Sequence, residues 1–241
     1  RTAGPGDAAE LTDVLGGIFA AGRDCGPATF DVPLVSHALG EDGTYHYLAA
    51  DGALSYRWNL AADELFVSGA AAGSAAAARA LWAIVASHGT IASRVQAVVS
   101  PADPVTWLTA EPDVSLTRAE QWMLRLLDAP AALAGRGFPA AVSLSVPLTV
   151  TDRQLPANSG DWRLEVSGGG AALTPARPGA RPAEPGPAGS LRLGARGLAA
   201  LYAGTPLGTL RQAGLAAGGT PGADAALDAA FAAVPYLTES F

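Results

Sequence analysis

The sequence predicts a mixed α+β fold built from two consecutive modules. The first half reads as helix, three strands, helix and strand, whereas the second half reads as alternating strands followed by helices. The chain has 241 residues, of which 49% are hydrophobic and 15% charged, a composition typical of globular domains. We place the first module at residues 1–115 and the second at residues 116–241.

The elements of the first module follow from local patterns. Five apolar residues recur at helical spacing near the start of the chain: Leu11, Val14, Leu15, Ile18 and Phe19. The Asp51-Gly52 dipeptide is typical of a hairpin turn, and Ser74 suits the N-cap of a later helix. The expected elements are a helix over 7–21, strands over 44–49, 53–59 and 64–69, a helix over 74–87 and a strand over 93–99.

The second module begins with a short apolar segment, 121–127, that suits a strand. A proline at position 130 suits the first turn of a short helix over 129–135. Residues 175–189 carry five prolines and predict a surface loop. The other expected elements are strands over 141–150, 161–167, 171–175 and 190–193, then helices over 196–203, 206–217 and 222–233.

Charge and composition exclude several functions. The net charge is −7 and the chain contains no lysine, so it lacks the basic surface of a nucleic-acid-binding protein. An acidic chain favours cationic or neutral partners, although acidity can also serve solubility alone. No apolar run reaches the roughly 18 residues of a membrane span, and the first residues do not resemble a secretory signal. We therefore expect a cytoplasmic protein without a membrane span.

Common catalytic and metal-binding patterns are missing. Cys25 is the lone cysteine, which excludes a disulfide framework and a cysteine-based zinc site within the chain. His37, His46 and His88 fall in different predicted elements, so we expect neither a cysteine nucleophile nor a metal site. The Gly-x-Ser-x-Gly pattern of serine hydrolases does not occur. The five tryptophans are spread along the chain and are expected mainly in the core, or else in a ligand cleft.

A turn of small residues, 70-AAAGSA-75, joins the third predicted strand to the following helix. Acyl-CoA enzymes of the GNAT class carry an Arg/Gln-x-x-Gly-x-Gly/Ala turn at this place, whose backbone N–H groups bind pyrophosphate. Gly73 and Ala75 match the small positions, but Ala70 stands where arginine or glutamine belongs. The turn is therefore either a degenerate cofactor site at Gly73 and Ala75 or simply an alanine-rich helix start.

Ordered segments of the chain resemble the Eis-type (enhanced intracellular survival) acetyltransferases. In the first half the similar segments are 53–58, 64–85 and 103–114, which resemble the central GNAT domain of that family. In the second half they are 116–146, 148–152, 158–166, 193–215 and 229–241, which resemble its last domain. The resemblance implies a GNAT-like domain at 1–115 and a domain with the sterol-carrier-protein fold at 116–241.

The resemblance also implies an activity and its parts. Eis-type enzymes transfer acetyl from acetyl-CoA to polycationic amines, including aminoglycosides, and typically assemble as hexamers. Their N-terminal GNAT domain binds acetyl-CoA and supplies the catalytic tyrosine, whereas the central domain does not bind the cofactor. That first domain is missing here, so we expect the chain to be the C-terminal two-thirds of such an enzyme. The alternatives are a separate binding module that carries a lipid or hydrophobic small molecule, or a scaffold.

The end of the chain, 235-PYLTESF-241, is the expected catalytic segment. In the family the C-terminal carboxylate reaches the active site as a base, and here it belongs to Phe241. Glu239 and Tyr236 are expected to contact the amine substrate. The alternative is that Phe241 only fills a gap in the core.

Overall fold

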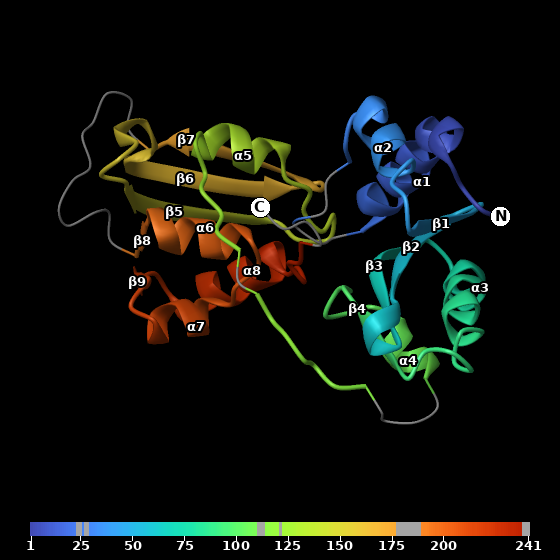
Figure 1. The fold of residues 1–241 in the computed structure, drawn as a ribbon. Helices are drawn as coiled ribbons and strands as arrows, with labels where there is room; N and C mark the ends of the chain where they lie inside the picture. The colour runs from blue at the N-terminus through green and yellow to red at the C-terminus, as the bar shows by residue number, and fades with distance from the viewer. Residues whose placement is uncertain (23–25, 27–28, 110–113, 121, 177–188, 238–241) are drawn as a thin grey trace. The chain divides into compact units, whose positions relative to one another are not determined.

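The computed structural model describes residues 1–22, 26, 29–109, 114–120, 122–176 and 189–237 (Figure 1). The chain forms two compact units, one of residues 1–120 with the chain end from Tyr236, the other of residues 121–235. Both units combine a sheet with helices, which confirms the predicted α+β fold. Among the described helices, none has the length and apolarity to cross a bilayer.

The first unit is built on a four-stranded sheet in the order β1-β2-β3-β4. The first three strands form an antiparallel meander, and β4 lies parallel to β3 because a helix connects the two. The strands are β1 (Thr44–Ala49), β2 (Gly52–Asn59), β3 (Glu64–Ala72) and β4 (Arg94–Ala97). The helices are η1 (Pro5–Asp7), α1 (Ala8–Ala21), α2 (Val32–Ala38), η2 (Leu60–Ala62), α3 (Ala75–Ala86) and α4 (Val105–Leu108).

Alternating residues of β2 face two different helical layers. Leu54 and Tyr56 join the cluster that includes Leu81 of α3, whereas Ala53 joins the cluster that includes Leu11 of α1. The hairpin between β1 and β2 is present as predicted. Its glycine, Gly52, serves helix packing, since an added Cβ would lie 2.9 Å from Leu81 Cδ1 and 3.2 Å from Ala77 Cβ.

Strand β3 separates from β4 halfway along its length. The register between β2 and β3 shifts at Ser55/Tyr56, so β3 carries one extra residue there, Ser68. The parallel pairing of β3 with β4 ends at Val67↔Ala97, while β3 continues to Ala72 beside β2 alone. The far half of β3 therefore has one edge with no described strand beside it.

The second unit is built on a five-stranded sheet in the order β7-β6-β5-β8-β9. Inward-facing side chains of β5 and β6, such as Leu148 and Leu164, form one core cluster with helical residues such as Leu133 and Leu227. The strands are β5 (Leu144–Thr151), β6 (Gly160–Ser167), β7 (Gly170–Pro175), β8 (Leu191–Gly194) and β9 (Ala216–Gly218). The helices are α5 (Ala129–Gly135), η3 (Pro156–Asn158), α6 (Ala195–Tyr202), α7 (Leu207–Gln212) and α8 (Pro221–Phe231).

Two predicted elements of this unit are wrong in part. Segment 122–127 pairs with no described strand, although Leu126 is buried in the core. The helix expected over 206–217 ends at Gln212, and residues 216–218 form β9 instead. Gly214 has a φ of 71°, a left-handed conformation that favours glycine and ends the helix. Most of the proline-rich loop expected over 175–189 lies outside the described residues.

We expect trypsin to cut the chain after Arg118 before it cuts after Arg125. The Arg118 side chain is 81% exposed in a segment without helix or strand, whereas the Arg125 side chain is 34% exposed and bound to Asp152. Proteases need an accessible, locally extended backbone. Intact mass after brief digestion should show residues 1–118 and 119–241 before any fragment that ends at 125. Equal cleavage after Arg118 and Arg125 would contradict the expectation that the segment around Arg118 is the more accessible of the two.

Candidate functional site

The connection between β3 and α3 is held by two hydrogen bonds from backbone N–H groups, one to a carbonyl and one to a side chain. The Gly73 N–H donates to the Asp51 carbonyl at 2.7 Å, and the Ala77 N–H donates to Ser74 Oγ at 3.1 Å. Ser74 is therefore the N-cap that the sequence predicted. The Gly73 N–H, in the loop, and the Ala77 N–H, in the first turn of α3, are therefore both already bonded within the chain.

The small residues of this loop have packing reasons of their own. A Cβ on Gly73 would lie 3.3 Å from the Asp51 carbonyl oxygen and 3.5 Å from Ile18 Cγ1, so glycine allows the hairpin and α1 to approach. Ala75 is exposed in the first turn of α3. The structure thus places Gly73 and Ala75 at the predicted turn and gives Gly73 a structural role.

A shallow hollow lies beside the free half of β3 and opens to solvent, and it has a volume of only about 10 Å³, room for about one water molecule. Its lining combines β3, α3 and the start of α4: Ala70, Ala71, Ala72, Ala78, Leu81, Trp82, Asp103 and Pro104. Asp103 is 8% exposed and accepts a hydrogen bond of 2.8 Å from the Val105 N–H. Burial raises the pKa of this carboxyl, and the bond from Val105 offsets part of the rise.

The residues of this region do not fit the pyrophosphate of acetyl-CoA. Position 70 offers no cation or amide, and the Gly73 and Ala77 N–H groups are engaged within the chain. Two carboxylates, of Asp51 in the hairpin and Asp103 in the hollow, add negative charge where a phosphate would need positive charge. No step through acetyl-CoA can be assigned to this loop.

We therefore expect residues 1–241 to bind acetyl-CoA with a dissociation constant weaker than about 10 µM, roughly 7 kcal/mol of binding free energy. Isothermal titration measures this directly. The variant Ala70→Arg restores the missing cation but not the two engaged N–H groups, so it should bind no better than about 10 µM. Tight binding by the wild-type chain would contradict the assignment, and tight binding by the variant would show that only the cation was missing.

The expected tail residues are only partly within the described structure. Tyr236 is half-buried and groups with the first unit. Phe241 and Glu239 lie outside the described residues. Their roles as base and substrate contact remain predictions.

The histidines are not brought together. His46 Nδ1 lies 2.8 Å from Ser55 Oγ, His88 Nε2 lies 2.9 Å from the Tyr56 hydroxyl, and His37 is exposed. Burial lowers the pKa of His46. Cys25 lies outside the described residues. Over the ranges that the structure describes, no group of three potential ligands could hold a metal ion.

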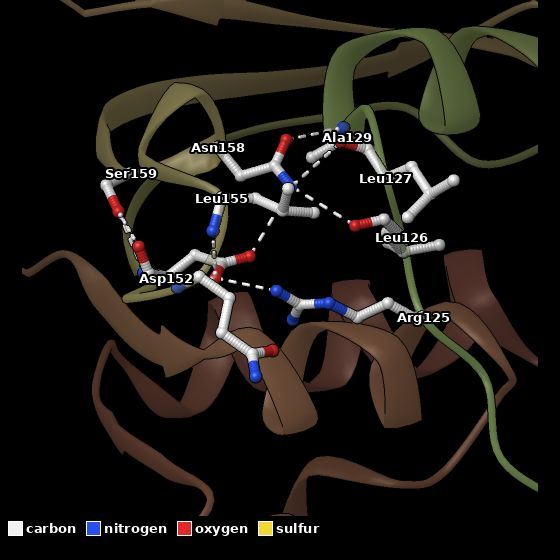
Figure 2. A network of polar contacts seen from close by, with 9 residues as sticks. Arg125, Leu126, Leu127, Ala129, Asp152, Leu155, Asn158 and Ser159 are labelled. Carbon is white, nitrogen blue, oxygen red and sulfur yellow. Dashed lines mark hydrogen bonds and ion pairs between the residues drawn. The ribbon is translucent and has the colours of Figure 1, made fainter.

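Sequence reasoning missed a buried carboxylate, Asp152, that follows β5 (Figure 2). Its Oδ1 accepts hydrogen bonds from Arg125 Nη2 at 2.7 Å, the Leu155 N–H at 2.9 Å and the Gln154 N–H at 3.0 Å. Burial alone would raise the pKa of Asp152, but the donors Leu155, Arg125, Gln154 and Asn158 together lower it. Asp152 is therefore an ionised group that is built into the second unit.

Asn158 continues this network toward the start of α5 (Figure 2). Its Oδ1 accepts from the Ala129 N–H at 2.9 Å, and its Nδ2 donates to the carbonyls of Leu126 at 3.1 Å and Leu127 at 3.3 Å. The Trp162 Nε1 donates to the Asn158 carbonyl at 3.1 Å. One amide side chain thus supplies the hydrogen bonds that a neighbouring strand would otherwise give to segment 126–129.

A second buried charge, Arg136, lies where three helices of the second unit end. Its guanidinium donates to the carbonyls of Gly137 at 2.9 Å, Tyr202 at 3.1 Å, Phe231 at 3.1 Å and Ala230 at 3.5 Å. Three aromatic rings lie within 5.7 Å of the guanidinium carbon: Phe138, Tyr202 and Phe231. Cations are stabilised at helix C-termini and over aromatic faces, so carbonyls and rings replace a carboxylate partner.

Comparison with known proteins finds a similar family for each half of the chain. Residues 35–126 match the model of the acetyltransferase (GNAT) domain, and residues 129–238 match that of the sterol carrier protein domain. The first half of the chain is thus similar to GNAT acetyltransferase domains and the second half to sterol carrier protein domains. No curated protein matches the chain.

Solved structures of acetyltransferases match both units together. A GCN5-related N-acetyltransferase from Kribbella flavida is 42% identical, with a TM-score of 0.90 over 100% of this chain and 59% of its own. One from Anabaena variabilis shares the fold at 22% identity, with a TM-score of 0.86 over 100% of this chain and 62% of its own. Eis1 from Mycobacterium abscessus is 26% identical, with a TM-score of 0.69 over 97% of this chain and 61% of its own. The chain thus spans about three fifths of these relatives.

Proposed function

We propose that this chain is part of an acetyl-CoA-dependent N-acetyltransferase whose cofactor is bound outside the loop at residues 70–75. The observation that carries the proposal is the 42% identity, over the whole chain, to an N-acetyltransferase that is longer than this chain. The N–H groups of Gly73 and Ala77 already form hydrogen bonds within the chain. This supports cofactor binding by another GNAT domain rather than by the loop at residues 70–75.

We further propose an amine substrate of the polycationic, aminoglycoside-like kind. The net charge of −7 supports it, since an acidic protein attracts polycations over distance. The likeness to Eis1 supports the same class of enzyme. The hexamer expected from the resemblance stays a prediction.

In this proposal the C-terminal carboxylate of Phe241 removes a proton from the ammonium form of the substrate. Glu239 and Tyr236 contact the amine, and the Phe241 ring anchors the terminus. A carboxylate accepts a proton efficiently only at hydrogen-bond distance from the donor, so the position of the terminus matters more than the side chain.

Two variants of the enzyme completed with its cofactor-binding domain test the tail. Adding one glycine after Phe241 keeps the ring but moves the carboxylate by about 3.5 Å. We expect a fall in kcat of about 100-fold or more, the range for loss of a general base. Deleting Phe241 should lower kcat similarly.

The matched control replaces Thr238 with serine, which keeps the length of the tail, and should leave kcat unchanged. If the extension leaves kcat unchanged while the deletion only lowers the melting temperature, the Phe241 ring has a packing role and its carboxylate has no catalytic one.

The alternative of a lipid carrier lacks a supporting observation in the described structure. Leu133, Leu164 and Leu227 are fully buried in the core cluster of the second unit. The hollow found in this unit, of about 400 Å³, is wide open to solvent, and Ser143, Ser145, Glu165 and Ser167 line it together with Leu144 and Val166.

A further inference from the structure

Gly26, in the connection between α1 and α2, has no room for a side chain where the end of the chain passes it. A Cβ added to Gly26 would overlap the carbonyl oxygen of Tyr236, and it would lie 2.8 Å from the carbonyl carbon and 3.6 Å from the nitrogen of the same residue. Both residues belong to the first unit. The Gly26 Cα therefore packs directly against the Tyr236 main chain, a close approach that glycine permits.

The backbone conformation of Gly26 favours glycine for a second reason. Its φ is 142°, a value that residues with a Cβ rarely adopt. Gly43 also has a positive φ, of 79°, but a Cβ there would meet nothing within 4 Å. At Gly26, by contrast, all three atoms nearest to the added Cβ belong to Tyr236. The conformation of Gly26 thus coincides with a specific contact to the tail.

The contact lies where the chain leaves the second unit. Residues 121–235 form that unit, and Tyr236 groups with the first unit. Pro235 fixes its own φ at about −65°, so the backbone reaches the contact with restricted freedom. Five residues follow Tyr236, a stretch that spans at most about 18 Å. The position of Tyr236 therefore limits where the carboxylate of Phe241 can act.

We propose that Gly26 is the positioning residue of the tail: its bare Cα seats the Tyr236 main chain and so keeps the Phe241 carboxylate within reach of the amine substrate. The catalytic part rests on the proposed function, in which that carboxylate accepts a proton. The seat itself does not, because it follows from the contact between Gly26 and Tyr236.

The seat is tested in residues 1–241 by ¹⁵N relaxation measurements. In the wild-type chain we expect the Tyr236 and Leu237 amides to have order parameters of about 0.85, the value of rigid backbone. In Gly26→Ala the added Cβ displaces Tyr236, and both values should fall below about 0.6. The amides of β2 and β3 should keep their wild-type order parameters, which checks that the first unit still folds. Wild-type tail values already below about 0.6, or unchanged tail values in Gly26→Ala, would overturn the seat.

Two other glycine-to-alanine substitutions in the first unit are matched controls. Gly17→Ala changes an exposed position of α1 where a Cβ meets nothing within 4 Å. Gly43→Ala introduces the strain of a positive φ without a clash. Neither should alter the order parameters of Tyr236 and Leu237. If Gly43→Ala loosens the tail as much as Gly26→Ala does, backbone strain rather than the contact is responsible and the proposal is wrong.

The positioning role is tested in the enzyme completed with its cofactor-binding domain. Gly26→Ala should lower kcat by about tenfold or more, the factor that a typical cost of overpacking corresponds to, and leave the KM for acetyl-CoA unchanged. If Gly26 acts only through the tail, Gly26→Ala should cause no further fall in kcat once Phe241 is deleted. An equal fall with and without Phe241 would show a general structural effect and overturn the positioning role. A loosened tail with unchanged kcat would support the seat and contradict the proposed role of the carboxylate.

Discussion

Replacing Asp152 with alanine should lower the free energy of unfolding of the second unit by about 3–5 kcal/mol, the range for breaking a buried ion pair. The substitution removes the acceptor of two backbone N–H groups, those of Gln154 and Leu155. It also removes the partner of Arg125, whose bond holds the segment before α5. Each hydrogen bond to a charged group contributes about 1.5–3 kcal/mol, so the losses together reach this range.

Urea unfolding of the variant, followed by tryptophan fluorescence, measures this change. Arg125→Met is the matched control and should cost less, about 1–2 kcal/mol, because Asp152 keeps its backbone donors and the arginine is partly exposed. A loss below about 1 kcal/mol for Asp152→Ala would contradict the role assigned to the network.

The same carboxylate stabilises the folded chain more at neutral pH than at acidic pH. The pKa of Asp152 is lower in the folded chain than its usual 3.8, so the unfolded chain binds the proton first as the pH falls. The stabilisation is therefore complete above pH 3.8 and is lost as the pH falls through the folded pKa. In Asp152→Asn this part of the acid destabilisation should be absent.

Replacing Arg136 with methionine should destabilise the second unit by a similar amount, about 3–5 kcal/mol. Methionine fills much of the same volume but donates no hydrogen bonds to the carbonyls of Tyr202, Ala230 and Phe231. Two of these bonds reach buried carbonyls at the end of α8. Arg136→Lys should recover only part of the loss, because one ammonium cannot reproduce the planar geometry of the guanidinium.

The control for Arg136 is Arg196→Met, a change at an exposed arginine in the first turn of α6. It should alter the free energy of unfolding by less than about 0.5 kcal/mol. If both variants unfold at the same urea concentration as the wild type, the carbonyl contacts of Arg136 contribute little to stability.

Local patterns predicted most elements of both sheets, because alternation and capping are properties of neighbouring residues. Ser74 at the start of α3 and the hairpin before Gly52 are examples. The helix predicted over 206–217 is longer than α7 because the apolar pattern continues past Gly214. The left-handed conformation of Gly214 ends the helix before that. The unpaired segment 122–127 alternates like a strand, but its hydrogen bonds come from the side chain of Asn158, which lies far along the sequence.

The candidate sites were less predictable from sequence. The small residues at 70–75 fit both a degenerate phosphate loop and a packed turn, and only the bond from Gly73 to Asp51 distinguishes them. Asp103 stands before a proline and looks like an ordinary helix cap, because its burial depends on β3 and α3, which are distant in sequence. Arg136 gave no local signal, since its carbonyl partners other than Gly137 lie 66 to 95 residues later.

The long separation between Arg136 and the end of α8 has a consequence for protein synthesis. The carbonyls of Ala230 and Phe231 are needed to surround this guanidinium, so the second unit cannot close until its last helix has been translated. At roughly 5–20 residues per second, the stretch from residue 121 to residue 231 takes about 5–20 s to make. The sheet of the first unit, complete by Ala97, is available to fold throughout that interval. During it the strands of the second unit present apolar faces without their helices, the period in which a nascent chain most needs protection from aggregation.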